Sequence, residues 1–181
     1  FEMYARRVIC SVPFRWVPNW VLQEYYKSKN VAVNHFTKPE FRDVRHFLGI
    51  NYHQDAMDFF NEEPDYVTAY LYLQNVNLDC SPLLVFPNSH KYGANIWPHF
   101  INHKVKNKYI YKIDNGSEFE IQNKILLGKP GNLYFWHGHI LHGATTNHST
   151  EPRLSIRYLF RKKKGSNDSI INIVNKNIDG K

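Results

Sequence analysis

The sequence predicts a mainly β protein, an antiparallel sandwich or barrel of the jelly-roll type that follows a few N-terminal helices. From Ile50 onward the chain is a succession of short runs rich in β-branched and aromatic residues, which is typical of strands. Turn signals built from Pro, Gly, Asn and Asp separate these runs. Many short strands at such spacing favour a sandwich or barrel over a βαβ fold, and a closed jelly roll also removes exposed sheet edges.

Two helices are predicted in the N-terminal part. The first covers residues 20–28 (WVLQEYYKS), with Asn19 as its cap. The second covers residues 40–48 (EFRDVRHFL), because Thr37 and Glu40 have the spacing of a capping box and a glycine follows the run.

The β-rich block holds eight strand candidates. They are INYHQD (50–55), DYVTAYLYLQNV (65–76), PLLVFP (82–87), KYIYKI (108–113), SEFEIQ (117–122), KILLG (124–128), GNLYFWHG (131–138) and RLSIRYLF (153–160). No repeat or flexible linker divides the chain, so we expect one domain over residues 1–181. Within it we expect a helical part (1–49), a β core (50–161) and an Asn-rich tail (162–181). The chain starts at Phe1 and not at Met, which leaves open that residues precede it.

The composition narrows the class of protein. With 181 residues, 43% apolar and 22% charged, the chain is an ordinary globular sequence long enough to enclose a pocket. No run reaches the roughly 18 to 20 apolar residues of a membrane span, so we expect a soluble, cytoplasmic protein without a membrane partner. Cys10 and Cys80 are too few for a disulfide framework and are expected to be small buried residues.

The chain carries a net charge of +7, which would suit a polyanionic partner. Part of this positive charge comes from a basic run near the end of the chain, Arg161 to Lys164. No helix-turn-helix, zinc finger or RNP-like motif accompanies this run, so a solvated chain end is the favoured interpretation and nucleic acid is not the expected partner.

The first candidate for chemistry is His53-Gln54-Asp55. Residues two apart on a strand project from the same face, so the imidazole of His53 and the carboxylate of Asp55 can converge on one cation while Gln54 points away. Taken alone, the pair is equally well explained as two surface residues.

The second candidate lies at the other end of the block, where His137, His139 and His142 precede a polar turn. Two histidines and one carboxylate form the facial triad that holds non-haem Fe(II) and leaves three coordination positions open. A 2-oxo acid fills two of them and dioxygen the third. Spacing alone leaves open which of the three histidines is the ligand.

The strand that follows supplies an anchor for such a co-substrate. Arg153 offers a planar, two-pronged donor for a distal carboxylate, and Ser155 shares its face of the strand. Arg157 has the same parity but lies a further strand step away, so it is less expected to touch the ligand.

Together these motifs resemble the phytanoyl-CoA dioxygenase branch of the Fe(II)/2-oxoglutarate-dependent oxygenases. The resemblance covers residues 53–160 and includes, besides the two clusters, the run LLVFPNSHKYG, which is similar to that family's Pro-Gly-Ser-His-Lys turn. Here Asn88 replaces the usual Gly, a swap that we expect to be tolerated because Asn accepts the left-handed conformation.

The resemblance implies a fold and a site. The fold would be a double-stranded β-helix, which is jelly-roll and cupin-like. Fe(II) would be held by His53, Asp55 and His142, and 2-oxoglutarate would be anchored by Arg153 and Ser155. Two further co-substrate contacts are carried over, Tyr70 beside the co-substrate and Gln54 through a hydrogen bond behind the ligands.

The activity implied is hydroxylation of a C–H bond in a small-molecule substrate, with dioxygen consumed and succinate and carbon dioxide released. The basic and aromatic stretch from Trp97 to Lys112 is the candidate for contact with an anionic substrate, the other interpretation being an exposed insertion.

Two other functions are compatible with parts of the sequence. The first is a catalytically silent jelly-roll module that binds an anionic glycan or nucleic acid. The second is a Zn-dependent hydrolase that uses the same two histidines and aspartate. Arg153 argues against the hydrolase, which does not need an anchor for a 2-oxo acid. The identity of the substrate and the oligomeric state are not encoded in any motif.

Overall fold

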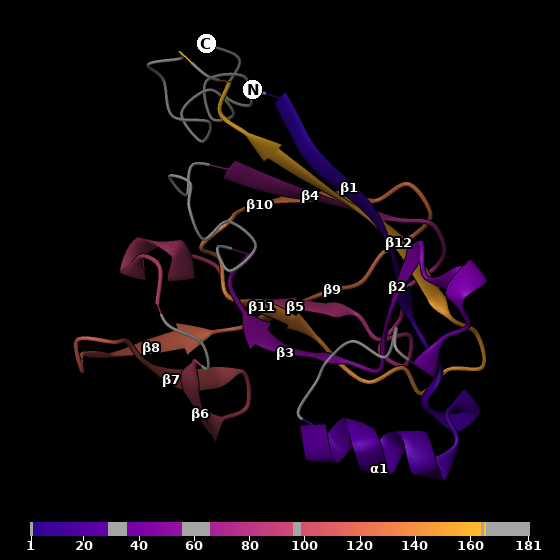
Figure 1. Cartoon of the computed structure of the whole chain (residues 1–181). Helices are drawn as coiled ribbons and strands as arrows, with labels where there is room; N and C mark the ends of the chain where they lie inside the picture. Colours follow the sequence, from indigo (N-terminus) through magenta and orange to yellow (C-terminus); the bar gives the residue numbers. More distant parts are fainter. Residues whose placement is uncertain (1, 29–35, 56–65, 96–98, 164, 166–181) are drawn as a thin grey trace.

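The computed structural model describes residues 2–28, 36–55, 66–95, 99–163 and 165. Its elements confirm the mainly β class (Figure 1). In order they are β1 (Glu2–Ser11), a 3-10 turn (Phe14–Trp16), α1 (Asn19–Ser28), a 3-10 turn (Pro39–Phe41), β2 (Val44–Phe47), β3 (Ile50–His53), β4 (Tyr66–Tyr72), β5 (Leu83–Val85), a 3-10 turn (Ser89–Tyr92), β6 (Phe100–Val105), β7 (Lys108–Lys112), β8 (Glu118–Gln122), β9 (Lys124–Leu126), β10 (Leu133–His137), β11 (His142–Ala144) and β12 (Arg153–Arg161).

Two sheets form the body of the fold. The larger has the strand order β10-β4-β12-β1-β2, and the smaller has the order β3-β11-β5-β9. Side chains from both sheets meet in the main core, among them Ile9, Tyr70 and Tyr72 from the larger sheet and Leu83 and Ala144 from the smaller. This arrangement of two largely antiparallel sheets around one core is the jelly roll that the strand pattern predicts.

A third sheet, β6-β7-β8, extends from the body beside β3 (Figure 1). It is fastened by a second core in which Tyr111 and Ile121 pack with Phe86 and Leu141. Phe86 and Leu141 flank the smaller sheet, so this core fixes the three-stranded sheet beside the strands that carry the candidate metal ligands.

All eight predicted strands are present, and the helix predicted over residues 20–28 is confirmed as α1. The helix predicted over residues 40–48 is wrong, because that segment holds a short 3-10 turn and then β2. The N-cap position of the turn is Lys38, without a side-chain cap, so Thr37 does not form the expected capping box. Parallel pairing of β2 with β1 supplies the backbone hydrogen bonds that a helix would otherwise have made.

The N-terminal part is therefore less helical than expected, since it also contributes β1. This strand lies inside the larger sheet, antiparallel to β12 and parallel to β2. The predicted tail lies outside the described residues from 166 onward.

Three smaller predictions concern the conformation of Asn88, the state of the two cysteines and the absence of membrane-spanning helices. Asn88 adopts the left-handed conformation, with φ 67° and ψ −2°. Cys10 is buried and Cys80 partly buried, and both are free thiols. No helix within the described ranges is both long and apolar enough to cross a membrane.

Candidate metal centre and anion pocket

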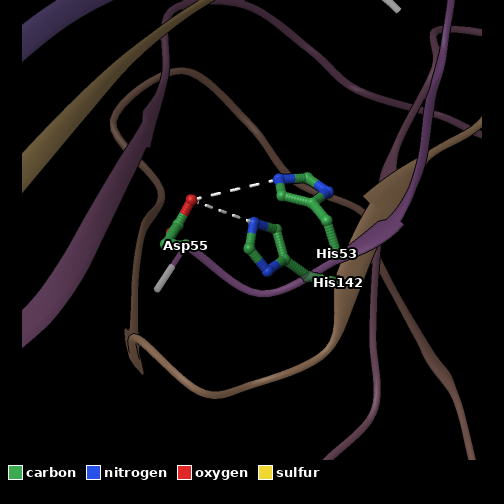
Figure 2. Close-up of side chains that lie close together, drawn as sticks. All are labelled: His53, Asp55 and His142. Carbon is green, nitrogen blue, oxygen red and sulfur yellow. Dashed lines mark ion pairs between the residues drawn. The ribbon is translucent and has the colours of Figure 1, made fainter. Parts of the chain in front are cut away.

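Three side chains from two distant segments meet in the structure. His53 ends β3, Asp55 follows two residues later, and His142 begins β11 directly opposite His53 in the β3–β11 ladder. Asp55 faces both imidazoles (Figure 2), with its Oδ1 3.9 Å from Nε2 of His53 and 3.6 Å from Nε2 of His142. The cross-strand pairing thus brings together the group that the two sequence motifs predict.

Both imidazoles present a lone pair to this centre. Nδ1 of His53 lies 2.8 Å from the carbonyl oxygen of Asn51, and Nδ1 of His142 lies 2.9 Å from that of Ile140. A carbonyl only accepts, so each Nδ1 carries the proton and each Nε2 is left as a ligand atom. Burial lowers the pKa of His53 to about 3, which keeps its ring neutral at physiological pH.

Asp55 is completely buried and fully hydrogen-bonded. Its Oδ2 accepts from Oγ1 of Thr68 at 2.5 Å and from Nε1 of Trp136 at 3.3 Å. Its Oδ1 accepts from Nη1 of Arg157 at 2.8 Å. Burial by itself would raise the pKa of this carboxyl, yet the neighbouring His142 and the Arg157 guanidinium hold the pKa well below its usual value. Asp55 is therefore an anion whose Oδ1 faces Nε2 of both histidines.

Local packing holds the strand of His142 in place. The hydroxyl of Ser89, in the turn that contains Asn88, donates to the carbonyl of Phe86 and accepts from the backbone N–H of Leu141. Gly143 lets β3 pass close to β11, since a Cβ at that position would lie 2.6 Å from the carbonyl oxygen of Ile50. The close approach of these two strands is what sets the distance between the imidazoles.

Arg153 lies on the inner side of the larger sheet and is 1% exposed. Its Nη1 donates to the hydroxyls of Tyr70 at 2.8 Å and Ser155 at 2.7 Å, and its guanidinium lies 5.7 Å from the centre of the Tyr70 ring. Its Nε is buried and has no hydrogen-bond partner among the described residues, and no described carboxylate forms an ion pair with it. A buried cation with an unused donor is costly unless an anionic ligand completes it.

Aromatic contacts connect the two parts of the site. The Trp136 ring lies 5.0 Å from the His142 ring and stacks on Tyr70 at 5.7 Å, and Tyr70 in turn contacts Arg153. A continuous chain of side-chain contacts therefore links the cluster of His53, Asp55 and His142 to the buried group of Tyr70, Arg153 and Ser155, which we name the anion pocket.

Of the predicted site residues, six are brought together: His53, Asp55 and His142 in one cluster, and Tyr70, Arg153 and Ser155 in the other. Gln54 does not join them. Its Nε2 donates to the carbonyls of Gly93 and His139, and its Oε1 accepts from the backbone N–H of Asn95, so its polar atoms connect loops beside the cluster.

The remaining histidines of the second motif lie elsewhere. The His137 ring packs against His139 at 4.9 Å and against His90 at 5.6 Å. In the basic stretch, Trp97 lies outside the described residues, and Lys104 and Lys108 pair with Glu120 on an exposed surface.

Two residues were missed or undervalued from the sequence. Arg157 contacts Asp55, although its strand position suggested that it lies too far along to take part. Ser11 stands directly opposite Arg153 in the β1–β12 ladder, is 1% exposed, and its hydroxyl has no hydrogen-bond partner within the described chain. Opposite residues of an antiparallel pair share a face, so Ser11 lies on the same face of the larger sheet as Arg153. Ser11 could have been found from the sequence only by recognising β1 as a strand that pairs with the strand of Arg153.

Comparison with known proteins gives one family. Residues 4–155 match the model of the family described as Phytanoyl-CoA dioxygenase (PhyH). No curated protein matches the sequence.

Solved structures that are similar to this chain include three proteins, of which two are described as non-haem. One is the epimerase SnoN from nogalamycin biosynthesis, described as alpha ketoglutarate dependent (19% identity, TM-score 0.43, 68% of this chain and 49% of that chain). Another is EvdO2 from Micromonospora carbonacea var. aurantiaca complexed with 2-oxoglutarate (17%, 0.44, 67% and 49%). The third is the monooxygenase ThoJ in a nickel complex (13%, 0.43, 61% and 36%). The chain spans half or less of the length of each.

Proposed function

The chain belongs to the phytanoyl-CoA dioxygenase family, and from this membership and the geometry of the site we propose that it is an Fe(II)- and 2-oxoglutarate-dependent dioxygenase. The reaction proposed is hydroxylation of an unactivated C–H bond in a small-molecule substrate, with consumption of dioxygen and release of succinate and carbon dioxide. The iron ligands proposed are His53, Asp55 and His142, and the co-substrate anchors are Arg153, Ser155 and Tyr70.

The donor set suits a ferrous ion. Two imidazole nitrogens and one carboxylate oxygen lie within 4.8 Å of one another, which suits a facial triad. Bound there with 2-oxoglutarate, iron would supply the oxidising power for C–H chemistry. The protein prepares these ligand atoms in two ways. The carbonyls of Asn51 and Ile140 accept from Nδ1 of the two histidines, which directs Nε2 of each ring to the metal. Arg157 keeps Asp55 ionised.

The observation that carries the proposal is the buried guanidinium of Arg153. It is 1% exposed and retains a buried Nε without a partner in the described chain. A dicarboxylate with one end at this guanidinium and the other at the cluster would satisfy that donor. The hydroxyls of Ser155 and Tyr70 already orient the guanidinium, so little ordering remains to be done when the co-substrate binds.

The same observation separates the proposal from its two alternatives. A zinc hydrolase needs the three metal ligands but has no use for a buried cation behind them. A silent binding module has no use for either group, because surface glycans or nucleic acids would not reach side chains that are almost fully buried.

The test is formation of succinate from 2-oxoglutarate. Protein reconstituted with Fe(II) in air is expected to convert 2-oxoglutarate slowly even without a primary substrate, followed by NMR of succinate. His142→Ala and Arg153→Leu should both abolish this turnover. Arg161→Leu, at the far end of the same strand as Arg153, is the matched control and should retain it.

Two results would contradict the proposal. One is succinate formation by His142→Ala at the rate of the unmodified chain. The other is an activity supported by Zn²⁺ that consumes no 2-oxoglutarate, which would indicate a hydrolase.

A further inference from the structure

Two arginines of the larger sheet, Arg7 on β1 and Arg45 on β2, project from the face that the sheet turns towards the core. Ile9 belongs to the main core and Phe47 packs against it. Ile9 is two residues from Arg7 on β1, and Phe47 is two residues from Arg45 on β2. Residues two apart on a strand share a face, so both arginines are on the inner face. Both are exposed, so a molecule that enters from solvent can reach them.

Arg7 is one strand away from a side chain that contacts the metal centre. It lies directly opposite Arg157 in the β1–β12 ladder, and the guanidinium of Arg157 reaches Oδ1 of Asp55 at 2.8 Å. Arg45 is paired with Ile9 in the β1–β2 ladder. From the spacing of strands and of residues along them, it lies diagonally across from Arg7 at about 8 Å. Three arginines thus form a row from Asp55 across β12 and β1 to β2, strands that are neighbours in Figure 1.

The charges of Arg7 and Arg45 are not balanced within the described part of the chain. Neither forms an ion pair or a side-chain hydrogen bond with a described residue, and Asp43, just before β2, pairs with neither. Asp55 is already hydrogen-bonded through both of its oxygens. Like charges directly opposite each other destabilise a sheet. Arg7 and Arg157 are such a pair, and a bound anion beside them would offset the repulsion.

A guanidinium is suited to one class of ligand. Its planar fork of N–H donors binds carboxylate and phosphate oxygens through two parallel hydrogen bonds. The 2-oxoglutarate of the proposed function does not require Arg7 or Arg45, because its anchor is Arg153. Arg153 is four residues from Arg157 on β12, which is about 13 Å along the strand. The two exposed arginines are therefore available for a second oxyanion.

We propose that Arg7 and Arg45 bind a carboxylate or phosphate group of the primary substrate and so place an adjoining part of that molecule beside the metal centre. This role rests on the proposed function, which is the reason to expect a primary substrate. An anionic substrate would then contact β1 and β2. It would not need the basic stretch from Trp97 to Lys112, whose Lys104 and Lys108 are paired already.

The test is a binding measurement on the metal-free chain, which does not depend on turnover. The probes are hexyl phosphate, hexanoate, hexanol and hexylamine, which share one alkyl chain and differ in the head group. Dissociation constants are measured at pH 7.5 from the NMR signals of the arginine side chains. At least one of the two anions is expected to bind about tenfold more tightly than hexanol and hexylamine. The tighter of the two anions identifies the substrate group as a phosphate or a carboxylate.

Variants of the two arginines locate the bound anion. Arg7→Gln and Arg45→Gln should each weaken its binding by roughly 2- to 5-fold, the value of an exposed ion pair. The double variant should lose the preference for anions over hexanol. Arg6→Gln is the matched control, because Arg6 is exposed and adjacent in sequence but projects from the opposite face of β1. It should bind like the unmodified chain.

Two results would overturn the proposal. One is an anion preference that survives the double variant, and loss of that preference in Arg153→Leu would then place the anion in the anion pocket. The other is equal weakening in Arg6→Gln and Arg7→Gln, which would indicate a general effect of charge. Because no iron or 2-oxoglutarate is present in these titrations, failure of succinate formation is a separate result.

Discussion

Arg157 donates a hydrogen bond of 2.8 Å to Oδ1 of Asp55, the same carboxylate oxygen that faces both imidazoles. A guanidinium and a divalent cation would therefore share one oxygen. In the metal-free protein Arg157 supplies the positive charge that a buried carboxylate requires. It thereby keeps the site assembled before a metal arrives.

Arg157→Gln should make the protein more dependent on metal for its stability. Breaking a buried ion pair costs about 3–5 kcal/mol, and a bound cation would compensate for that loss. We expect the metal-free variant to melt at a lower temperature and to gain more from added Mn²⁺ than the unmodified chain does, as measured by calorimetry. Arg161→Gln, which breaks the pair with Glu2 at the end of the same strand, is the control. An equal gain in both proteins would contradict this role.

Ser11→Ala should weaken the binding of 2-oxoglutarate without destabilising the protein. The hydroxyl is buried without a described partner, so its removal leaves the melting temperature of the free protein unchanged or higher. A hydrogen bond to a charged group is worth about 1.5–3 kcal/mol, so the Kd for 2-oxoglutarate with Mn²⁺ should rise roughly 10- to 150-fold in calorimetric titrations. An unchanged Kd would place Ser11 outside the anion pocket.

Gly143→Ala should weaken metal binding by separating β3 from β11. The added Cβ would lie 2.6 Å from the carbonyl oxygen of Ile50, so the strands must move apart and His53 with them. Gly49→Ala is the matched control, because its nearest contact would be at 3.4 Å. We expect the Kd for Co²⁺, followed by its visible absorption, to rise in the first variant and to stay close to the original in the second. Equal effects would contradict this reading of the strand spacing.

His99 should make the metal-free protein sensitive to acid. Its pKa is about 4 in the folded chain and 6.5 by reference, so between these values the unfolded chain binds the extra proton. Stability should therefore fall as the pH drops from 6.5 towards 4, by up to about 1.4 kcal/mol per pH unit from this group. Urea unfolding at pH 8, 6 and 5 should show a shallower decline for His99→Gln. Identical pH slopes for the two proteins would show that His99 does not have the lowered pKa given above.

The parts of the fold that depend on local pattern were predictable. Strands β4, β10 and β12 alternate or are densely β-branched and aromatic, and turn residues bound them. β11 escaped prediction because it is only three residues long, His142–Ala144. β2 was assigned to a helix because Thr37 and Glu40 imitate a capping box, whereas pairing with β1, which no local pattern records, decides its structure.

The same distinction between local and distant contacts applies to the candidate site. Two pairs of site residues are spaced by two positions within one segment, so strand alternation alone predicts that each pair shares a face. They are His53 with Asp55 and Arg153 with Ser155. The contacts of Arg157 and Ser11 depend on how β12 lies against the loop after β3 and against β1. Such a relation between distant strands is tertiary, so no single motif contains it.

The place of β1 also bears on how the chain is made. Its ladder runs from Glu2 with Arg161 to Ser11 with Arg153, so β1 pairs chiefly with a strand that is synthesised much later. Until synthesis reaches β12, β1 lacks its main neighbour, and closing this loop of about 150 residues is a slow entropic step of the kind that high contact order imposes. Until then, nascent chains would expose the edge of β1 that later pairs with β12, which makes them natural clients for chaperones.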